Sequence, residues 1–366
     1  MRVLVCPDKF RGTLGAAGVA EAIATGWHRA RPDDELDLAP MADGGEGSAD
    51  ALIGDGGRWV SCTVRGPLGD PIDAAFALRR DGVAVIESAR ASGFALLSDA
   101  RRDPRRTTTE GTGDLMRRAL DEGASQLLVC LGGSATNDGG TGMAVALGAR
   151  FLDSAGDPLP PGGAALLELA SIDLTWLDRR LATTRVVALA DVRNPLTGPQ
   201  GASAVFGPQK GASGDDVWVL DRALAHLAAV TGRDVGISPA DEPGAGAAGG
   251  LGFGLLAFTG ARLRPGAAAV AEAIELERRV READLVITGE GSFDATSLQG
   301  KVVGYVLDLA RTASTPVRVV AGRVDGSRTG VVSMAEEVGL EAAMTQTRGS
   351  LAHVAASLAE RVEVDR

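Results

Sequence analysis

Lysine is nearly absent from this sequence of 366 residues, since only three of its 37 basic residues are lysine and the others are arginine. The bias indicates a general preference for arginine on solvated surfaces, so the remaining lysines are informative. They are Lys9 in CPDKFRG, Lys210 in FGPQKGA and Lys301 in LQGKV, each close to a glycine. Phosphate sites often use the compact point charge of an ammonium, which a planar guanidinium cannot copy. The lysines suggest phosphate chemistry, although chance placement beside frequent glycines explains them equally well at this point.

Cysteine and histidine are equally scarce, with three copies of each. Cys6, Cys62 and Cys130 are odd in number and lie in apolar stretches, which predicts buried free thiols rather than disulfides. The histidines are scattered and lack metal-ligand spacing. The sequence therefore argues against a zinc site and against a catalytic triad built on histidine.

Positive charge and long apolar runs are also lacking. The formal net charge is −11, whereas nucleic acids and anionic membranes bind basic surfaces. No apolar run approaches the length of a membrane span, and the N-terminal MRVLVCPD begins a strand rather than the apolar region of a signal peptide. We therefore expect a cytoplasmic protein that binds neither nucleic acid nor membrane. Any phosphorylated ligand must find local positive charge.

Short apolar strands alternate with helical segments along the chain. The first strand, at residues 3–6, is followed by helical periodicity over residues 16–30 and by a strand in ELDLAP. Similar strands are predicted at residues 83–87, 126–131, 185–190, 284–288 and 316–321. Apolar strands separated by helices form parallel sheets, which bind ligands at the carboxyl ends of their strands. The pattern predicts an α/β fold, and the length corresponds to about two domains.

A junction between domains is predicted near Gly66. The segment TVRGPLGDPIDAAFAL has the Gly-Pro and Asp-Pro turns of a hairpin, which differ from the pattern before it. No internal repeat or low-complexity linker is visible in the sequence. Two consecutive domains and one domain inserted into another are therefore equally compatible with the residues alone.

Three glycine-rich loops lie between predicted strands and helices. In PMADGGEG, Asp43 and Glu46 flank two glycines and are suited to a divalent cation or to orienting a hydroxyl. In RRTTTEGTGDL, the threonines supply hydroxyls or cap a helix. In LGGSATNDGGTGM, many backbone amides lie beside Ser134, Asn137 and Asp138, which suits phosphate or a small hydroxy acid. Close packing of a strand on a helix explains the same glycines equally well.

Two further loops carry acids at predicted strand ends. RVVALADVRNPLTG places Asp191 three residues before Asn194, a pair of hard oxygen ligands suited to magnesium. DLVITGEGSFDATSLQGK places Glu290, Asp294 and Lys301 around another strand end, as in phosphoryl-transfer sites. Each loop alone is explained by solvated charge, but five such loops at strand ends favour function.

Two familiar nucleotide-binding patterns are not matched. GAGAAG, at residues 244–249, has the spacing of a dinucleotide motif, but SPADEP before it is not a strand. The P-loop pattern fails around Lys301, because Ala295 stands in place of its first glycine and Val302 in place of Ser or Thr. A nicotinamide-dependent dehydrogenase and a non-catalytic nucleotide sensor remain alternatives to a kinase.

Nine motifs follow one another along the chain: CPDKFRGTL, PMADGGEG, GPLGDP, TTTEGTGDL, LGGSATNDGGTGM, DVRNPLTGPQGA, FGPQKGA, PGAGAAGGLG and ITGEGSFD. In this order they resemble the bacterial glycerate kinases of the type I family, the glycerate 2-kinases, over essentially the whole chain. The sequence departs from the family at Lys9, Arg11 and Ser292, where Ser, Lys and Arg are common. A cation is kept at position 11, and we expect Lys9 to replace the cation missing at position 292.

The resemblance implies ATP-dependent phosphorylation of D-glycerate, with Mg²⁺ as cofactor and glycerate and ATP as small-molecule substrates. Bacterial members are associated with 2-phosphoglycerate, which favours the C2 hydroxyl over the C3 hydroxyl of a glycerate 3-kinase. The implied fold has two α/β domains with mainly parallel, Rossmann- or flavodoxin-like sheets and a cleft between them. We expect a discontinuous domain at residues 1–65 plus 284–366 and an inserted domain at 66–283. Oligomeric state, including a homo-oligomer, stays open.

Roles for individual residues follow from the matching motifs. Asp191 is the first choice for the acid that orients magnesium or accepts the hydroxyl proton, with Asp43 and Asp294 as competitors. The expected catalytic residues are Asp191, Asp43 and Lys9. The residues expected to bind glycerate are Arg11, which clamps its carboxylate, Asp8, Asn137, Asp138 and Ser134. The residues expected to bind the nucleotide are Lys301, Glu290, Asp294, Gly289 and Gly291. The expected magnesium ligands are Asp191 and Asn194.

Overall fold

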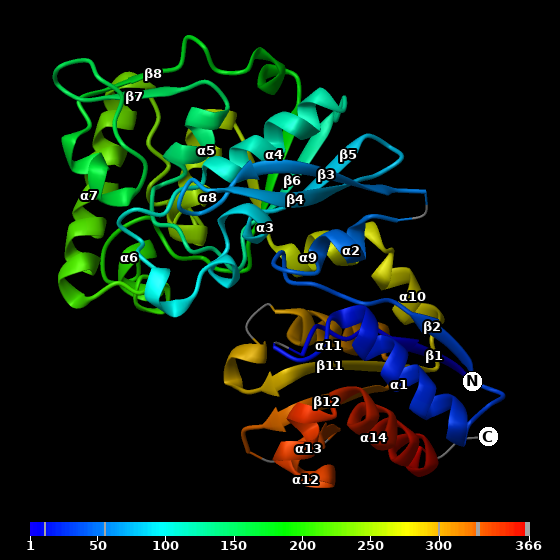
Figure 1. The fold of residues 1–366 in the computed structure, drawn as a ribbon. Helices are drawn as coiled ribbons and strands as arrows, with labels where there is room; N and C mark the ends of the chain where they lie inside the picture. The colour runs from blue at the N-terminus through cyan, green and yellow to red at the C-terminus, as the bar shows by residue number, and fades with distance from the viewer. Residues whose placement is uncertain (11, 55, 299–300, 327–329, 363–366) are drawn as a thin grey trace. The chain divides into compact units, whose positions relative to one another are not determined.

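The structure is a computed structural model that describes residues 1–10, 12–54, 56–298, 301–326 and 330–362 (Figure 1). The chain divides into two compact units. The first unit contains Met1–Asp43 and Gly266–Arg366, and the second contains Gly44–Pro265. Across the described ranges, no helix is long and apolar enough to cross a membrane.

The first unit is built on a sheet of five parallel strands. In spatial order they are β13 (Val331–Ser333), β12 (Val317–Val324), β11 (Leu285–Phe293), β1 (Arg2–Val5) and β2 (Glu35–Leu38). Because β2 and then β11 lie on opposite sides of β1, this is the flavodoxin-like order, which reverses between β1 and β11. Ligands of such sheets bind at the carboxyl ends of the strands beside the reversal.

Helices pack on both faces of this sheet. They are α1 (Ala16–Ala30), α9 (Gly266–Ala273), α10 (Leu276–Glu282), α11 (Val302–Ala313), α12 (Met334–Val338), α13 (Leu340–Thr345) and α14 (Thr347–Arg361). Successive side chains of a strand point to opposite faces. Val320 of β12 accordingly packs in the core formed with α1 and α14, whereas Val319 packs against Val303 of α11.

The second unit is built on a mixed six-stranded sheet. In spatial order its strands are β10 (Arg262–Arg264), β9 (Arg185–Leu189), β6 (Gln126–Cys130), β5 (Val83–Glu87), β4 (Pro71–Leu78) and β3 (Arg58–Arg65). The first four are parallel, and β4 and β3 form the antiparallel hairpin that the turn residues predict. Gly66 N closes this hairpin by donating to Asp70 O at 2.7 Å. A separate pair is formed by β7 (Arg150–Leu152) and β8 (Ser171–Asp173).

The helices of the second unit are α2 (Ser48–Leu52), α3 (Ala89–Ser92), α4 (Glu110–Asp121), α5 (Thr141–Ala146), α6 (Ala202–Phe206), α7 (Gly214–Asp234) and α8 (Ala247–Thr259). They enclose two hydrophobic layers, one against the six-stranded sheet and one around α7. Helix α8 belongs to both layers. Its Leu251 packs in the core of the sheet and α4, while its Phe253 packs with Leu224 and Leu227 of α7.

The boundaries of the two units lie elsewhere than the predicted boundaries at residues 65 and 284. Strand β3 belongs to the second unit, because it pairs with β4 along its whole length. Helices α9 and α10 belong to the first unit, where Arg279 of α10 forms an ion pair with Asp37 of β2. Both differences arise from pairings that the local sequence does not reveal.

Strand β11 is longer than the predicted strand at residues 284–288, because it continues to pair with β12, with Glu290 opposite Ala321. Gly289 and Gly291, expected in a nucleotide-binding loop, are therefore strand residues. A side chain at Gly289 would overlap with the backbone carbonyl of Val320. The glycine thus allows the close approach of the two strands, and binding of the nucleotide by Gly289 and Gly291 stays a prediction.

All three cysteines are free thiols, as predicted. Cys6 and Cys130 are buried, whereas Cys62 on β3 is only partly buried. Burial raises the pKa of Cys6 to about 12. Because the thiolate is the reactive form, this cysteine is inert at neutral pH.

The contact between α1 and α14 depends on Gly26. A methyl group at this position would overlap with the backbone carbonyl of Ala352 in α14, whereas the same group at Gly349 of α14 would meet open space. We expect Gly26→Ala to lower the free energy of unfolding by about 1–3 kcal/mol, because backbone atoms must shift. Gly349→Ala is the matched control and should be neutral or stabilising by up to about 1 kcal/mol through helix propensity. Thermal unfolding of both variants measures the difference, and equal midpoints would contradict this account of the contact.

Candidate active site

The first unit brings two predicted site residues together at the carboxyl ends of β1 and β11. After β1 the chain remains beside β11, because Cys6 N donates to Ile287 O and Asp8 N donates to Gly289 O, both at 2.8 Å. Asp8 is consequently close enough to Glu290 for the negative charge of Glu290 to raise the pKa of Asp8. The two acids lie at the reversal of strand order, where flavodoxin-like sheets bind their ligands.

Burial and mutual repulsion shift the acids of this cluster toward protonation. Burial, together with the negative charge of Asp43, raises the pKa of Asp8 to about 7, although Lys9 opposes the shift. The backbone N of Lys9 donates to Asp8 Oδ1 at 2.7 Å, and its Nζ pairs with Asp43 Oδ1 at 3.1 Å. Burial also raises the pKa of Glu290, against opposing interactions that include the charge of Lys301. Groups that exchange protons near neutral pH are typical of catalytic sites.

Lys301 lies immediately before the first residue of α11, and its side chain is exposed. The preceding loop is shaped by Ser297, whose Oγ accepts a hydrogen bond from Asp294 N at 3.0 Å. A helix N-terminus and a lysine both attract anions, so this arrangement is compatible with the predicted binding of nucleotide phosphates near Lys301 and Asp294. Arg11, expected to clamp the glycerate carboxylate, lies outside the described residues.

The second unit presents two predicted loops at one edge of its sheet. Loop 132–140 follows β6, and Asp191 follows the neighbouring strand β9. Leu131 N donates to Leu189 O at 3.1 Å, so the two strands remain paired up to the start of these loops. The structure therefore places the LGGSATNDGG and DVRNP motifs side by side.

Asp138 is fully buried and organises loop 132–140. Its carboxylate accepts hydrogen bonds from Thr109 N at 2.8 Å, Thr109 Oγ1 at 2.9 Å, Gly140 N at 3.1 Å and Gly142 N at 3.2 Å. Burial raises its pKa, although these hydrogen bonds oppose the shift. With both oxygens occupied inside the protein, Asp138 positions the loop rather than contacting substrate. This corrects the expectation that it binds glycerate directly.

Ser134 and Asn137 lie in the same loop but have unused hydrogen-bonding capacity. Asn137 Nδ2 donates to Ser203 Oγ at 3.0 Å, whereas its Oδ1 is buried and has no hydrogen-bond partner within the described ranges. Ser134 Oγ accepts one hydrogen bond, from Lys210. Buried polar groups are normally satisfied, so these two side chains remain candidates for contact with a ligand.

Lys210 is one of the three lysines that the sequence singles out, but it was assigned no role in the site because GPQKGA reads as a turn. The segment does turn, with Lys210 as the last residue of the short helix η5 (Pro208–Lys210), but its side chain is only 2% exposed. Nζ donates to Thr136 O at 2.6 Å and to Ser134 Oγ at 3.0 Å. Burial lowers its pKa from 10.5 to about 7, partly offset by the charge of Asp138. The rarity of lysine in this chain was the one available signal.

The GAGAAG segment packs backbone against backbone and does not follow a strand. Ala248, Gly249 and Gly250 have positive φ values of 54°, 70° and 87° within α8. Gly249 O accepts from Gly139 N at 3.0 Å, and a side chain at Gly249 would overlap with Thr136 O. The glycines thus allow this segment to pack closely against loop 132–140. Because no strand directly precedes the segment, it does not have the structure of a dinucleotide motif.

Asp191 and Asn194 lie in the loop after β9. Asp191 is partly buried, and Asn194 is fixed by two hydrogen bonds. Its Nδ2 donates to Gln200 O at 2.7 Å, and its backbone O accepts from Gly246 N at 3.0 Å. The Asn194 amide is therefore oriented, with Oδ1 as its remaining acceptor.

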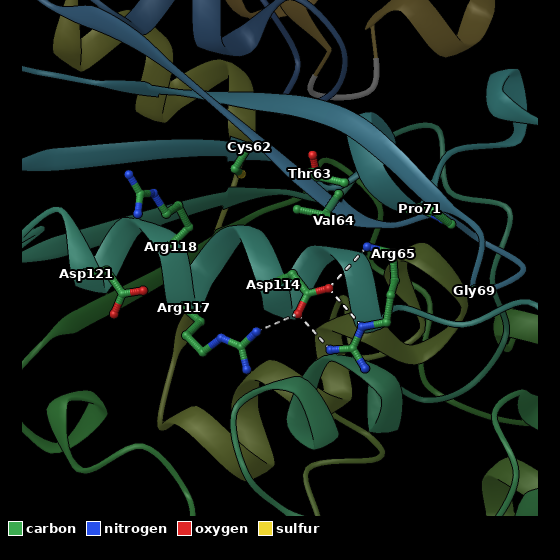
Figure 2. Close-up of a pocket in the computed structure, with 10 residues that line it drawn as sticks. All are labelled: Cys62, Thr63, Val64, Arg65, Gly69, Pro71, Asp114, Arg117, Arg118 and Asp121. Carbon is green, nitrogen blue, oxygen red and sulfur yellow. Dashed lines mark hydrogen bonds and ion pairs between the residues drawn. The ribbon is translucent and has the colours of Figure 1, made fainter.

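A cavity of about 390 Å³ lies beside β3 and α4, and the residues that line it belong to other segments of the chain than these loops (Figure 2). Its arginines are already paired: Arg65 binds Asp114 through two hydrogen bonds at 2.7 and 2.8 Å, and Arg117 binds the same carboxylate at 3.2 Å (Figure 2). These ion pairs compete with any anion for the arginine charges. The network instead ties α4 to the end of β3, and so anchors the threonines that hold Asp138.

Comparison with known proteins assigns the chain to a family. A model of the glycerate kinase family matches residues 3–363. The chain belongs to the glycerate kinase family. It is 47% identical to a glycerate kinase of Bacillus subtilis (strain 168), with 88% of this chain and 85% of the relative covered. It is 42% identical to a glycerate 2-kinase of Escherichia coli (strain K12), with 93% and 89% covered.

A solved structure agrees with this assignment. It is the crystal structure titled "putative glycerate kinase 2" from Salmonella typhimurium LT2, which superposes with a TM-score of 0.84 at 41% identity. The superposition covers 98% of this chain and 97% of that chain. The resemblance identified from nine motifs, and the α/β fold with mainly parallel sheets, are confirmed. As a member of the glycerate kinase family the chain is an enzyme, a kinase with ATP as co-substrate, and the dehydrogenase and sensor alternatives are not favoured.

The protonation of Asp8 predicts a pH-dependent stability. Its pKa is about 7 in the folded state and 3.8 without the fold, so between these values the unfolded chain loses its proton first. Stability of the wild type should therefore fall as pH rises from 4 to 7 relative to Asp8→Asn, which carries no ionisable group. Thermal midpoints should be higher for Asp8→Asn at pH 8, and the difference should shrink toward pH 4. A variant that is less stable at pH 8, or a difference independent of pH, contradicts the assignment.

Proposed function

We propose that this chain phosphorylates D-glycerate with ATP at the C2 hydroxyl, giving 2-phosphoglycerate and ADP. The observation that carries the proposal is the position of the matched motifs. In each unit several of them, including CPDKFRGTL, LGGSATNDGGTGM and DVRNPLTGPQGA, form loops at the carboxyl ends of parallel strands, where α/β folds bind their ligands. The Escherichia coli relative, named a glycerate 2-kinase, supports the choice of C2.

The proposed reaction is an in-line transfer. The C2 oxygen of glycerate forms a bond to the γ-phosphorus of ATP, while the bond from that phosphorus to the β–γ bridging oxygen breaks. The hydroxyl proton passes to a carboxylate of the protein. We assign the proton to Asp191, with Asp43 and Asp294 as alternatives. Asp191 is the first choice because it directly follows the parallel strand β9, at the edge where such sheets bind their ligands.

Magnesium fits the donor atoms of the loop after β9. Within the described ranges no group of three or more acidic, cysteine or histidine side chains is placed to hold a metal. Nucleotide-bound Mg²⁺ needs only one or two protein ligands, because phosphates and water complete its octahedron. We propose the oriented Oδ1 of Asn194 as one of those ligands. Asp191 is the other ligand in the alternative in which Asp43 or Asp294 accepts the proton. When bound, the ion would neutralise charge on the transferring phosphoryl group.

The remaining residues are assigned to the two substrates. We propose that Lys301 and Lys9 carry positive charge to the phosphates, near Glu290 and Asp294, which orient the loop before α11. Ser134 and Asn137 are proposed to bind glycerate, because both retain hydrogen-bonding capacity.

Asp8 and Arg11 complete the proposed glycerate contacts. The half-protonated carboxyl of Asp8 can accept a hydrogen bond from a glycerate hydroxyl or donate one to its carboxylate. Arg11 offers the bidentate fork for that carboxylate. Asp138 contributes indirectly, by holding the loop that carries Ser134 and Asn137.

Asp191→Asn tests the central assignment. The substitution keeps the shape of the side chain but removes its charge, so the variant should fold normally while turnover falls by roughly 10²–10³. Steady-state formation of ADP with glycerate measures the effect. The matched control is Asp121→Asn, which removes a half-exposed acid of the second unit paired with Arg180. The control should retain near-normal turnover, and equal activity in the two variants would refute the role of Asp191.

The identity of the product tests the proposed function. Enolase consumes 2-phosphoglycerate directly, whereas 3-phosphoglycerate requires a mutase first. Incubation of the protein with ATP, magnesium and D-glycerate should therefore feed enolase without added mutase. Phosphorus NMR of the product provides a second measurement. Consumption that begins only after mutase is added would identify the C3 hydroxyl as the acceptor and overturn the choice of C2.

A further inference from the structure

Lys210 is held inside the second unit by contacts from a distant part of the chain. Its backbone is turned at η5, where Lys210 N donates to Gly207 O at 2.9 Å and Gly211 follows with a φ of 97°. A side chain at Gly211 would come within 2.8 Å of Arg102 O. The glycine therefore allows the turn to sit close to that backbone and directs the lysine inward.

The hydrogen bonds of Lys210 determine how Ser134 can interact. A charged ammonium has three donors and no acceptor. Ser134 Oγ must therefore accept from Nζ, at 3.0 Å, and its own hydrogen must point to another group. Within the described ranges no acceptor for that hydrogen is found. Lys210 also donates to Thr136 O at 2.6 Å, which fixes the backbone on the other side of the same turn.

Two neighbouring side chains of the loop are also unsatisfied. Thr136 Oγ1 and Asn137 Oδ1 are buried and have no hydrogen-bond partner among the residues that the structure describes. Leaving a buried polar group without a partner costs about 1–3 kcal/mol, so such groups call for a ligand or water. Three polar side chains with unused capacity within four residues, next to a buried cation, indicate a binding loop rather than a purely structural turn.

We propose that Lys210 is a positioning residue of the kinase site: it fixes Ser134 Oγ as an acceptor, so that the Ser134 hydroxyl donates its hydrogen to the glycerate carboxylate. This inference rests on the proposed function, because glycerate is the ligand. A hydroxyl that accepts from a cation becomes a stronger donor, since hydrogen bonds in a chain polarise one another. An anionic oxygen is the acceptor that benefits most from this polarisation.

The survival of a lysine at this position agrees with the proposal. In a chain whose cations are almost all arginine, the buried cation beside Ser134 is one of three lysines. Burial lowers its pKa to about 7, so the protein holds the charge at a cost in stability. A guanidinium is larger and presents its donors in a fixed plane, so Lys210→Arg should not reproduce both contacts.

A double-mutant cycle tests whether Lys210 acts through Ser134. Glycerate KM, ATP KM and kcat are measured for the wild type, Ser134→Ala, Lys210→Met and the double variant. Each single substitution should raise the glycerate KM about tenfold, the range expected for a hydrogen bond to a charged group. The kcat and ATP KM should change far less. The double variant should be no worse than the worse single variant, because both remove one interaction.

Ser203→Ala is the matched control. It removes the acceptor of a different hydrogen bond of the loop, which Asn137 Nδ2 donates to Ser203 Oγ at 3.0 Å. Its effect should multiply with that of Ser134→Ala, whereas the effect of Lys210→Met should not. Should Lys210→Met fail to fold, Lys210→Gln, whose shorter side chain carries an uncharged amide in place of the ammonium, enters the same cycle.

Three outcomes would overturn the inference. They are multiplying effects of Lys210 and Ser134 substitutions, a normal glycerate KM in Ser134→Ala, and a rise confined to the ATP KM, which would assign the hydroxyl to phosphate. A wild-type protein that forms no ADP in response to glycerate would instead remove the proposed function itself. The two failures are therefore distinguishable.

Discussion

Backbone packs directly against backbone around loop 132–140, and the rest of the second unit depends on this contact. A side chain at Gly132 would come within 2.6 Å of the Cα of Gly45, and one at Gly140 within 3.0 Å of the Cα of Gly254. Close approach of this kind excludes water from the loop and leaves its polar groups to find partners inside the protein. The glycines, for which the sequence also allowed a role in close packing, thus produce a tightly enclosed loop.

Enclosure explains the two charges that the loop buries. Asp138 is satisfied by backbone and threonine donors, and Lys210 by one hydroxyl and one carbonyl. Burial shifts the pKa of each group toward its neutral form, so keeping either group charged lowers the stability of the fold. Such a cost indicates that the contacts of these groups serve function. The first unit follows the same logic, since Asp8 is buried beside other acids at the reversal of strand order. Perturbed ionisable groups of this kind concentrate at functional sites.

Much of the fold could be predicted because its signals are local. The helix at residues 16–30 and the strand at residues 83–87 have the bounds that their apolar patterns predict. Two features could not be predicted in this way, because they depend on long-range pairing. Strand β11 continues through glycines only because β12 lies beside it, and β3 belongs to the second unit only because it pairs with β4.

The candidate site divides along the same line. The strand-end positions of Asp8 and Asp191 follow from sequence, since acids after apolar strands gather at one edge of a parallel sheet, whereas Glu290 lies within β11. The internal role of Asp138 and the burial of Lys210 do not follow, because their partners are 29 and 76 residues away in the chain. A residue next to a glycine in a turn gives no local indication that its side chain points inward.

Hydrogen exchange with and without ligands tests most directly whether the strand-end loops, and not the arginine-lined cavity, hold the substrates. Backbone amides that are ordered by a ligand exchange more slowly, and mass spectrometry of peptides locates them. With glycerate and magnesium-ADP bound, we expect slower exchange in peptides covering residues 132–140, 191–194 and 288–294. Peptides covering residues 62–71 and 114–121 should be unchanged. Protection centred on the cavity, with residues 132–140 unaffected, would contradict the account.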